Sequence, residues 1–268
     1  MPEGPEVKNN SIALAESAFG KELISFSVVS GRYSRNELAG LDKFSSRLPT
    51  RVSGVGCHGK FVYIMFSNGF NLWSTFGMSG RWSKDRSKHS RLHMSFKDGT
   101  EVFFNDVRNF GTAKLVYGPQ KLISKLQSLG LDLLSEQVHP TVFISRLRDK
   151  DSSNICKVLM DQSILAGVGN YIKAESLWKA AMDPRKLVED FEDYELLELK
   201  DSIESIMKSS FDLGGASFRT HEKFSGDKGN YSDRFLCYNR KIDADGNVVE
   251  KIKTPDGRTT HWSPIRQG

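Results

Sequence analysis

Pro2 and Glu3 stand side by side near the start of the chain, and both residue types are suited to covalent chemistry. If Met1 is removed, Pro2 carries a free secondary amine, which can attack an electrophilic carbon and become an iminium. An α-amino group titrates near pH ~8, so a usable fraction of it is neutral at physiological pH. Glu3 would carry protons beside this amine. Taken alone, Pro2 is better explained as part of a segment that simply leads into a first helix.

Glu6, Lys60 and Glu175 are further charged candidates, and each has an ordinary alternative reading. Glu6 suits the first turn of a helix, where a negative charge is favourable. Lys60 follows a glycine at the start of an apolar strand, where a lysine is commonly solvated. Glu175 falls one turn inside a predicted helix and could lie on its surface. The residue types alone therefore leave both readings open for all three.

The segment Gly167-Val168-Gly169-Asn170 directly precedes the same predicted helix. Glycines let a backbone approach a phosphate closely, and the N-terminus of a helix offers free N–H groups to it. In isolation the pattern is more often a turn followed by a helix cap. It becomes a candidate phosphate site only together with other motifs.

Composition restricts the class of protein. The 268 residues carry a net charge of +5 with a pI near 9.0, and residues 214–268 hold ten Lys/Arg against seven Asp/Glu. Neutralisation of nucleic-acid phosphates is a direct use of such an excess. No apolar run is long enough to span a membrane, and no secretory leader is expected. The three isolated cysteines predict a reducing, intracellular compartment, no disulfide framework and no four-cysteine zinc site.

Hydrophobic periodicity predicts the order of elements. A first helix covers Glu6–Phe19. Many strands in about 100 residues then favour a sandwich or barrel. Helices take over after Gly118-Pro119, and a small β tail with a hairpin around Asp245-Gly246-Asn247 follows. The expected strands are Glu22–Ser30, Arg51–Phe66, Phe70–Trp82, Leu92–Tyr117, Phe235–Arg240, Val248–Lys253 and Arg258–Trp262, and the expected helices are Ser152–Gln162, Tyr171–Ala181 and Glu192–Phe211.

Four segments, in this order, resemble one family. They are MPEGPEV at 1–7, HGK at 58–60, NDVRNFG at 105–111 and LMDQSILAGVGNYIKAESLWKAAMDP at 159–184. Together they are similar to the Fpg/Nei DNA glycosylases, the formamidopyrimidine-DNA glycosylases and endonucleases VIII. The segments SGRYSR at 30–35 and FGMSGRW at 76–82 resemble the endonuclease VIII-like proteins of giant viruses. The tail of the chain is similar to the finger without zinc that vertebrate endonuclease VIII-like proteins also have.

The resemblance implies an α+β fold with an N-terminal β-sandwich and flanking helices, a helix–two-turns–helix segment and a C-terminal finger. Family members carry two CxxC pairs in that finger, which this sequence lacks. A zincless β-hairpin finger is therefore expected, held by a small core of Phe235, Tyr238, Val248, Ile252 and Trp262. The predicted regions are a catalytic β-sandwich (1–118), a linker (119–135), the helix–two-turns–helix domain (136–215), and a lesion loop with the finger (216–268).

The resemblance also implies roles for individual residues. Pro2 would attack C1′ of the damaged nucleotide, and Glu3 would protonate the sugar ring oxygen. Glu6 and Glu175 would support the active site. Lys60 would bind a phosphate beside the lesion and favour elimination. No metal and no organic cofactor is expected.

DNA contacts are implied for a second set of residues. Asn170 and Lys157 would lie close to the phosphates near the lesion, and Arg258 would bind phosphates from the tip of the finger hairpin. Extruding a damaged base leaves a gap in the duplex that the protein must fill. The wedge expected to fill this gap consists of Met78, Arg108 and Phe110. Without the resemblance, Met78 and Phe110 would be read as core residues.

The expected activity is that of a bifunctional DNA glycosylase and AP lyase, acting as a monomer on damaged DNA. Oxidised pyrimidines and hydantoins are the favoured substrates. An Fpg-type enzyme that removes 8-oxoguanine and formamidopyrimidines is the first alternative, because the stretch Ser217–Tyr238 loosely resembles the loop that covers 8-oxoguanine in such enzymes. A non-catalytic nucleic-acid-binding protein is the second.

Overall fold

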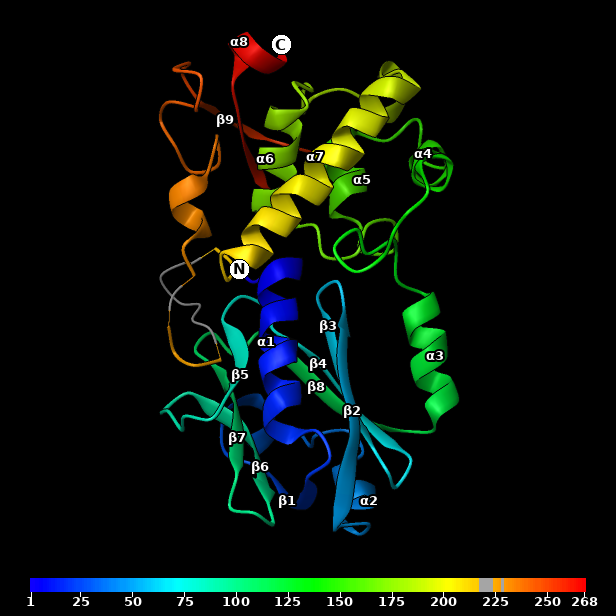
Figure 1. Cartoon of the computed structure of the whole chain (residues 1–268), viewed down its shortest axis with the longest axis vertical. Coiled ribbons are helices and arrows are strands. Elements are labelled where there is room, and N and C mark those ends of the chain that lie inside the picture. Colours follow the sequence, from blue (N-terminus) through cyan, green and yellow to red (C-terminus); the bar gives the residue numbers. More distant parts are fainter. Residues whose placement is uncertain (217–223, 228) are drawn as a thin grey trace. The chain divides into compact units, whose positions relative to one another are not determined.

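The computed structural model describes residues 1–216, 224–227 and 229–268, and it divides into two compact units (Figure 1). Each unit is built from two segments of chain. The first comprises residues 1–128 and 213–230, and the second comprises residues 129–212 and 231–268. Residues 217–223 and 228, which belong to the expected lesion loop, lie outside the described residues. The region 216–268, expected as one stretch, is thus shared between the units.

Helix α1 (Gly4–Ala18) begins at a capping box in which Glu3 and Glu6 each bind the other's backbone N–H. Pro5 occupies the first turn, where a missing N–H costs nothing. Val7, Leu14 and Ala18 are fully buried on one face and join the core of the first unit. The helix therefore carries the start of the chain on an element fixed by both capping and packing.

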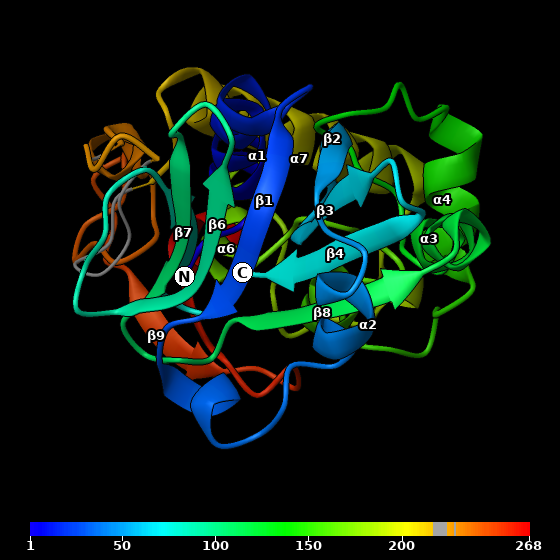
Figure 2. The same cartoon turned by 90° about the horizontal axis from the view of Figure 1, so that it is seen from below.

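Eight antiparallel strands form the first unit in the order β5-β7-β6-β1-β2-β3-β4-β8. Only two residue pairs join β1 to β2, so the sheet divides there into two halves that form the sandwich. Figure 2 shows β1, β6 and β7 lying roughly along one axis, with neighbouring strands antiparallel, and β4 and β8 running across them. The strands are β1 (Glu22–Val28), β2 (Thr50–His58), β3 (Phe61–Phe66), β4 (Phe70–Thr75), β5 (Gly80–Ser83), β6 (Ser90–Phe96), β7 (Glu101–Asp106) and β8 (Thr112–Tyr117).

Phe44 lies at the centre of an aromatic cluster in this core. Its ring centroid is 5.8 Å from that of Phe26, 4.8 Å from that of Phe66 and 5.4 Å from that of Phe70. Phe44 comes from the short helix α2 (Leu41–Ser45), so this helix closes the sandwich over strands from both halves of the sheet. Helix α3 (Pro119–Gln127), inside the expected linker, completes the first unit with the 3₁₀ turn Gly31–Ser34.

The second unit is mainly helical. Helix α6 (Asn170–Lys179) packs against α7 (Asp193–Asp212) and against the C-terminal hairpin, and Figure 1 shows α7 crossing α6. Residues 171–178 of α6 are all buried, so this helix forms the centre of the unit. The remaining elements are α4 (Pro140–Arg148), α5 (Ile155–Met160), α8 (Pro264–Gln267), the 3₁₀ turns Val188–Asp190 and Tyr231–Arg234, and the paired strands β9 (Glu250–Lys253) and β10 (Thr259–Trp262).

The predicted α+β fold with an N-terminal sandwich is confirmed, but the expected hairpin in the tail is wrong in detail. Phe235–Arg240 forms no strand, because the amides of residues 236–238 bind the side chain of Glu175 instead. A single antiparallel bridge between Ile242 and Val248 closes the expected turn at 245–247, whereas the two-stranded hairpin joins β9 to β10 around residues 254–257. Val248, expected in the finger core, is 60% exposed, whereas Phe235 and Trp262 are buried. Within the described ranges, no helix is long and apolar enough to cross a bilayer.

Candidate functional site

The carboxylate of Glu6 ties the start of the chain to a distant segment of the same unit. One oxygen accepts the N–H of Glu3 at 2.7 Å, and the other accepts the N–H of Ala216 at 2.6 Å. Glu3 and Glu6 are both almost completely buried, at 2% and 3% exposure. Because both oxygens of Glu6 are held by backbone donors, the side chain anchors the peptide between Pro2 and Glu3 to the segment at Ala216.

The surroundings of the α-amino group favour its neutral form. Burial lowers the pKa of the Met1 amine, and the positive charges of Lys60 and Arg108 act in the same direction. The carboxylates of Glu3 and Glu6 oppose this shift without cancelling it. The structure therefore gathers two carboxylates and two cations around the end of the chain, from α1 and from two turns of the sandwich.

Gly215 is required where it contacts Glu6. Its φ is +90°, and a Cβ atom at this position would lie 2.8 Å from Cγ of Glu6. Gly229 packs as closely on the other side, because a Cβ there would lie 2.1 Å from the carbonyl oxygen of Gly215. Gly215 thus lies between Glu6 and Gly229 with no room for a side chain.

The expected wedge residues lie on two neighbouring turns. Met78 follows β4, and Arg108 and Phe110 lie between β7 and β8. Phe110 is 52% exposed, and the Arg108 guanidinium lies 5.0 Å from its ring centroid. Gly77 packs against the backbone at Phe110, where a Cβ would lie 2.6 Å from the carbonyl carbon. The structure therefore brings all three wedge candidates together.

Asp106 holds these two turns in register, a role that the sequence did not reveal. One carboxylate oxygen accepts the hydroxyl of Ser79 at 2.6 Å, and the other accepts the N–H of Gly111 at 2.7 Å. The hydroxyl of Ser79 in turn accepts the N–H of Arg108 at 2.9 Å. Asp106 is 1% exposed. The NDVRNFG segment contains this residue, but nothing in its spacing distinguishes it from the neighbouring polar residues.

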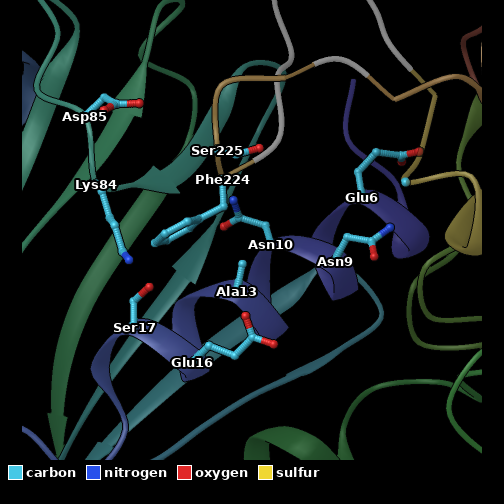
Figure 3. Close-up of a pocket in the computed structure, with 11 residues that line it drawn as sticks. Glu6, Asn9, Asn10, Ala13, Glu16, Ser17, Lys84, Asp85, Phe224 and Ser225 are labelled. Atoms are coloured by element: carbon cyan, nitrogen blue, oxygen red, sulfur yellow. The ribbon is translucent and has the colours of Figure 1, made fainter.

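A cavity of about 510 Å³ lies along one face of α1 in the first unit (Figure 3). Glu6 stands at one end of it and Ser17 towards the other, and the ring of Phe224 extends between Lys84 and Asn10. Asn10 is held by the backbone of Trp82, to which it donates at 2.9 Å and from which it accepts at 3.1 Å. The cavity was not predicted from the sequence.

In the second unit, Asn170 is the first residue of α6, and Gly169 is the N-cap. The amide of Asn170 donates to the carbonyl oxygen of Thr259 at 3.0 Å and so contacts the C-terminal hairpin. Arg258 is exposed where the turn of this hairpin meets β10, and Lys157 is exposed on α5. The two cations are therefore accessible to a ligand.

Glu175 is completely buried and holds the segment before the hairpin. Its carboxylate accepts the N–H groups of Leu236 at 2.6 Å, Cys237 at 2.8 Å and Tyr238 at 2.6 Å. Burial raises the pKa of Glu175, and the three N–H donors and the charge of Arg240 oppose this shift. With both oxygens bound to backbone, Glu175 is placed to support this segment.

The residues of the finger do not fit a zinc ion. Cys237 is the only cysteine of the tail, and burial, with the carboxylates of Glu175 and Asp243, raises the pKa of its thiol to about 12. The described part of the chain contains no cluster of three or more His, Cys, Asp or Glu side chains that could hold a metal. Side-chain contacts take its place: the indole of Trp178 donates to Asp243 at 2.9 Å, and Arg266 stacks on Trp178 at 4.1 Å.

Comparisons with known proteins agree with this geometry. The model of the formamidopyrimidine-DNA glycosylase N-terminal domain matches residues 1–113, and that of the formamidopyrimidine-DNA glycosylase H2TH domain matches residues 129–222. A formamidopyrimidine-DNA glycosylase of Lactococcus lactis subsp. cremoris is 31% identical over 278 residues, covering 100% of this chain and 99% of the relative. One of Halalkalibacterium halodurans is 30% identical and covers 100% of both chains.

Solved structures show the same similarity over the whole chain. A mutant Lactococcus lactis Fpg in complex with Fapy-dG containing DNA superposes with a TM-score of 0.88 at 29% identity, covering 99% of each chain. The wild-type Lactococcus lactis protein in complex with an oxidised pyrimidine containing DNA gives a TM-score of 0.86 at 28% identity, again over 99% of each chain.

Proposed function

This chain belongs to the formamidopyrimidine-DNA glycosylase family, whose members are DNA glycosylases and AP lyases of base excision repair, and we propose that Pro2 is its nucleophile. The observation that carries the proposal is the environment of the chain end. Burial and the charges of Lys60 and Arg108 lower the pKa of the amine there. After removal of Met1 the same environment would act on the amine of Pro2 and keep a larger fraction of it neutral and nucleophilic.

The proposed reaction begins with attack of the Pro2 nitrogen on C1′ of the damaged nucleotide. The glycosidic bond breaks and the base leaves with its electron pair. Glu3 protonates the sugar ring oxygen as the ring opens, which gives an iminium between Pro2 and C1′. The iminium acidifies the hydrogen at C2′, so loss of that proton expels the 3′ phosphate. A second elimination then expels the 5′ phosphate. Glu6, bound to two backbone N–H groups, holds the nucleophile in place.

We propose that cations and the wedge hold the DNA in the distorted form that this attack needs. Lys60 would bind a phosphate beside the lesion. Met78, Arg108 and Phe110 would enter the gap left by the everted base, which the exposure of Phe110 and its contact with Arg108 support. Asn170, Lys157 and Arg258 would contact phosphates from the second unit, and Glu175 would support its finger.

Oxidised pyrimidines and hydantoins are the proposed main substrates. The SGRYSR and FGMSGRW segments support this choice through their resemblance to endonuclease VIII-like proteins. A solved relative with the same fold, the Lactococcus lactis Fpg, has been captured with an oxidised pyrimidine in DNA. The alternative is a preference for formamidopyrimidine and 8-oxoguanine, which the names of the curated relatives and a complex of MutM with carbocyclic 8-oxo-G containing DNA favour. We propose further that the protein acts as a monomer inside the cell, without a metal or an organic cofactor.

Borohydride trapping tests the nucleophile. The protein, with Met1 removed, is incubated with a duplex carrying one abasic site and then reduced. We expect a covalent adduct that Pro2→Ala abolishes and that Glu16→Gln, a matched change on the outer part of α1, leaves intact. No adduct from the wild type would favour a non-catalytic DNA-binding protein. Duplexes with thymine glycol, a hydantoin or 8-oxoguanine then separate the two substrate classes by their single-turnover rates.

A further inference from the structure

Lys173 is a fully buried lysine on α6 that none of the proposed steps uses. Its side chain is 0% exposed, which is rare for a lysine unless its charge is paired. The partner is Asp256, whose carboxylate lies 2.6 Å from the ammonium and whose side chain is only 2% exposed. Removing one member of such a pair leaves an uncompensated buried charge, so the two residues constrain each other strongly.

Asp256 lies in the turn that joins β9 to β10. Its second carboxylate oxygen accepts the hydroxyl of Thr254, which also bonds to the hydroxyl of Thr260 at 2.7 Å. The N–H of Thr254 donates to the carbonyl oxygen of Arg258 at 3.1 Å, and the N–H of Gly257 donates to that of Thr254 at 2.9 Å. The ion pair therefore acts on the turn that carries Arg258.

A second side chain of α6 holds the other side of the same turn. Asn170 lies three residues before Lys173, so the two side chains project from the same face of the helix. Asn170 binds the carbonyl oxygen of Thr259, and Lys173 binds Asp256. The backbone of Arg258 is thus fixed between two attachments to α6, while its own side chain stays exposed.

We propose that Lys173 is a positioning residue for Arg258, and that its ion pair with Asp256 fixes the finger turn by side-chain contacts, without a metal. The inference rests on the phosphate contact proposed for Arg258. The surroundings of Asp256 favour its charged form. Burial acts to raise the pKa of Asp256, but the hydrogen bonds from Lys173 and Thr254 outweigh it and lower the pKa. The carboxylate form of Asp256 is thus favoured beside the ammonium of Lys173.

The test compares full-length Lys173→Met with wild type and with Lys200→Met. Lys200 is a matched control, because it is also buried and paired, with Glu204 at 2.7 Å, but within α7. Hydrogen exchange of the peptide spanning 254–260 should accelerate about tenfold or more in Lys173→Met and stay unchanged in Lys200→Met. This readout needs no DNA, so it remains decisive even if the protein fails to trap an abasic site.

DNA binding supplies the second readout. Arg258→Ala should flatten the slope of log affinity against log salt by about one phosphate contact. Lys173→Met should flatten it similarly, and the double variant with Arg258→Ala should add nothing further. A variant Lys173→Met that keeps the native exchange rate in the turn, or the native salt slope, would overturn the proposal.

The variant Lys173→Met/Asp256→Asn keeps the test decisive if the single variant fails to fold. It removes both buried charges and retains their approximate shape, so it should unfold near the wild-type temperature. We expect it to keep the accelerated exchange and the flatter salt slope. Wild-type behaviour of this variant in both measurements would show that the ion pair does not set the turn.

Discussion

Replacing Asp106 by alanine should loosen the segment that carries Arg108 and Phe110. The carboxylate accepts two hydrogen bonds, from Ser79 at 2.6 Å and from Gly111 at 2.7 Å, in a position that is 1% exposed. A hydrogen bond to a charged group contributes about 1.5–3 kcal/mol, and a donor left unpaired in the interior costs a similar amount. Asp106→Ala should therefore lower the free energy of unfolding by about 3–5 kcal/mol.

Asp106→Asn separates the hydrogen bonds from the charge. The amide oxygen can accept the N–H of Gly111, and the amide nitrogen can donate to the hydroxyl of Ser79, which is able to rotate. Both contacts survive as neutral hydrogen bonds, so the loss should be only about 1–2 kcal/mol. Asp98→Asn is a surface control in the same unit, where loss of an exposed pair with Lys21 at 2.9 Å should change little.

The assay has two parts. Denaturant unfolding gives the stability of the three variants, and single-turnover cleavage of an abasic duplex reports the wedge. Because Arg108 and Phe110 would lose their fixed position, Asp106→Ala should reduce kcat/KM about tenfold, or ~1.4 kcal/mol of transition-state stabilisation, beyond any effect of partial unfolding. The reasoning fails if the free energy of unfolding of Asp106→Ala lies within about 1 kcal/mol of the wild-type value, or if the alanine and asparagine variants behave alike.

Three further outcomes follow from the structure. Gly215→Ala should lower the free energy of unfolding by about 1–3 kcal/mol in denaturant, because φ is +90° and the new Cβ meets Glu6. Gly20→Ala should lower it less, because the added Cβ there meets no atom within 4 Å. Glu175→Ala leaves three buried N–H groups unpaired and should lower the melting temperature and speed exchange of residues 236–238, whereas an unchanged melt would contradict the bracing role. Hydrogen bonds outweigh burial and lower the pKa of Asp243 to about 2, so its contribution to stability is present above the unfolded pKa of 3.8 and is lost as pH falls towards 2. Asp243→Asn should flatten the acid-unfolding curve in that window, and an identical curve would refute the assignment.

Local patterns in the sequence were enough for most elements. The apolar spacing from Val7 to Phe19 predicts α1 to within two residues at its start and one at its end. Some predicted strands run across a turn that the pattern does not mark, as in the single run predicted for Arg51–Phe66, which turns at Gly59 to give two strands. Apolar spacing within one segment shows which of its faces is buried, and this does not depend on residues elsewhere in the chain. Helices and strands with clear spacing could therefore be predicted.

Contacts between distant residues explain the rest. Phe235–Arg240 has the composition of a strand, but its amides bind Glu175, about 60 positions earlier in the chain. Lys173 looks like an ordinary helical lysine, and only the packing of the hairpin on α6 shows that it is buried and paired. The role of Pro2 stays a prediction. It concerns a covalent reaction with DNA, and the structure supports it only through the surroundings of the amine.

The division of both units into two chain segments has a consequence for synthesis on the ribosome. The second oxygen of Glu6 can be bound only after Ala216 has been synthesised. The partners of Lys173 and Glu175, which are Asp256 and the amides of 236–238, belong to about the last forty residues of the chain. Until then a nascent α6 carries charged groups with no interior partner, which opposes its early burial. A chain truncated after Asp212 should accordingly give neither native unit, and messages with premature stops should yield protein that cellular proteases clear.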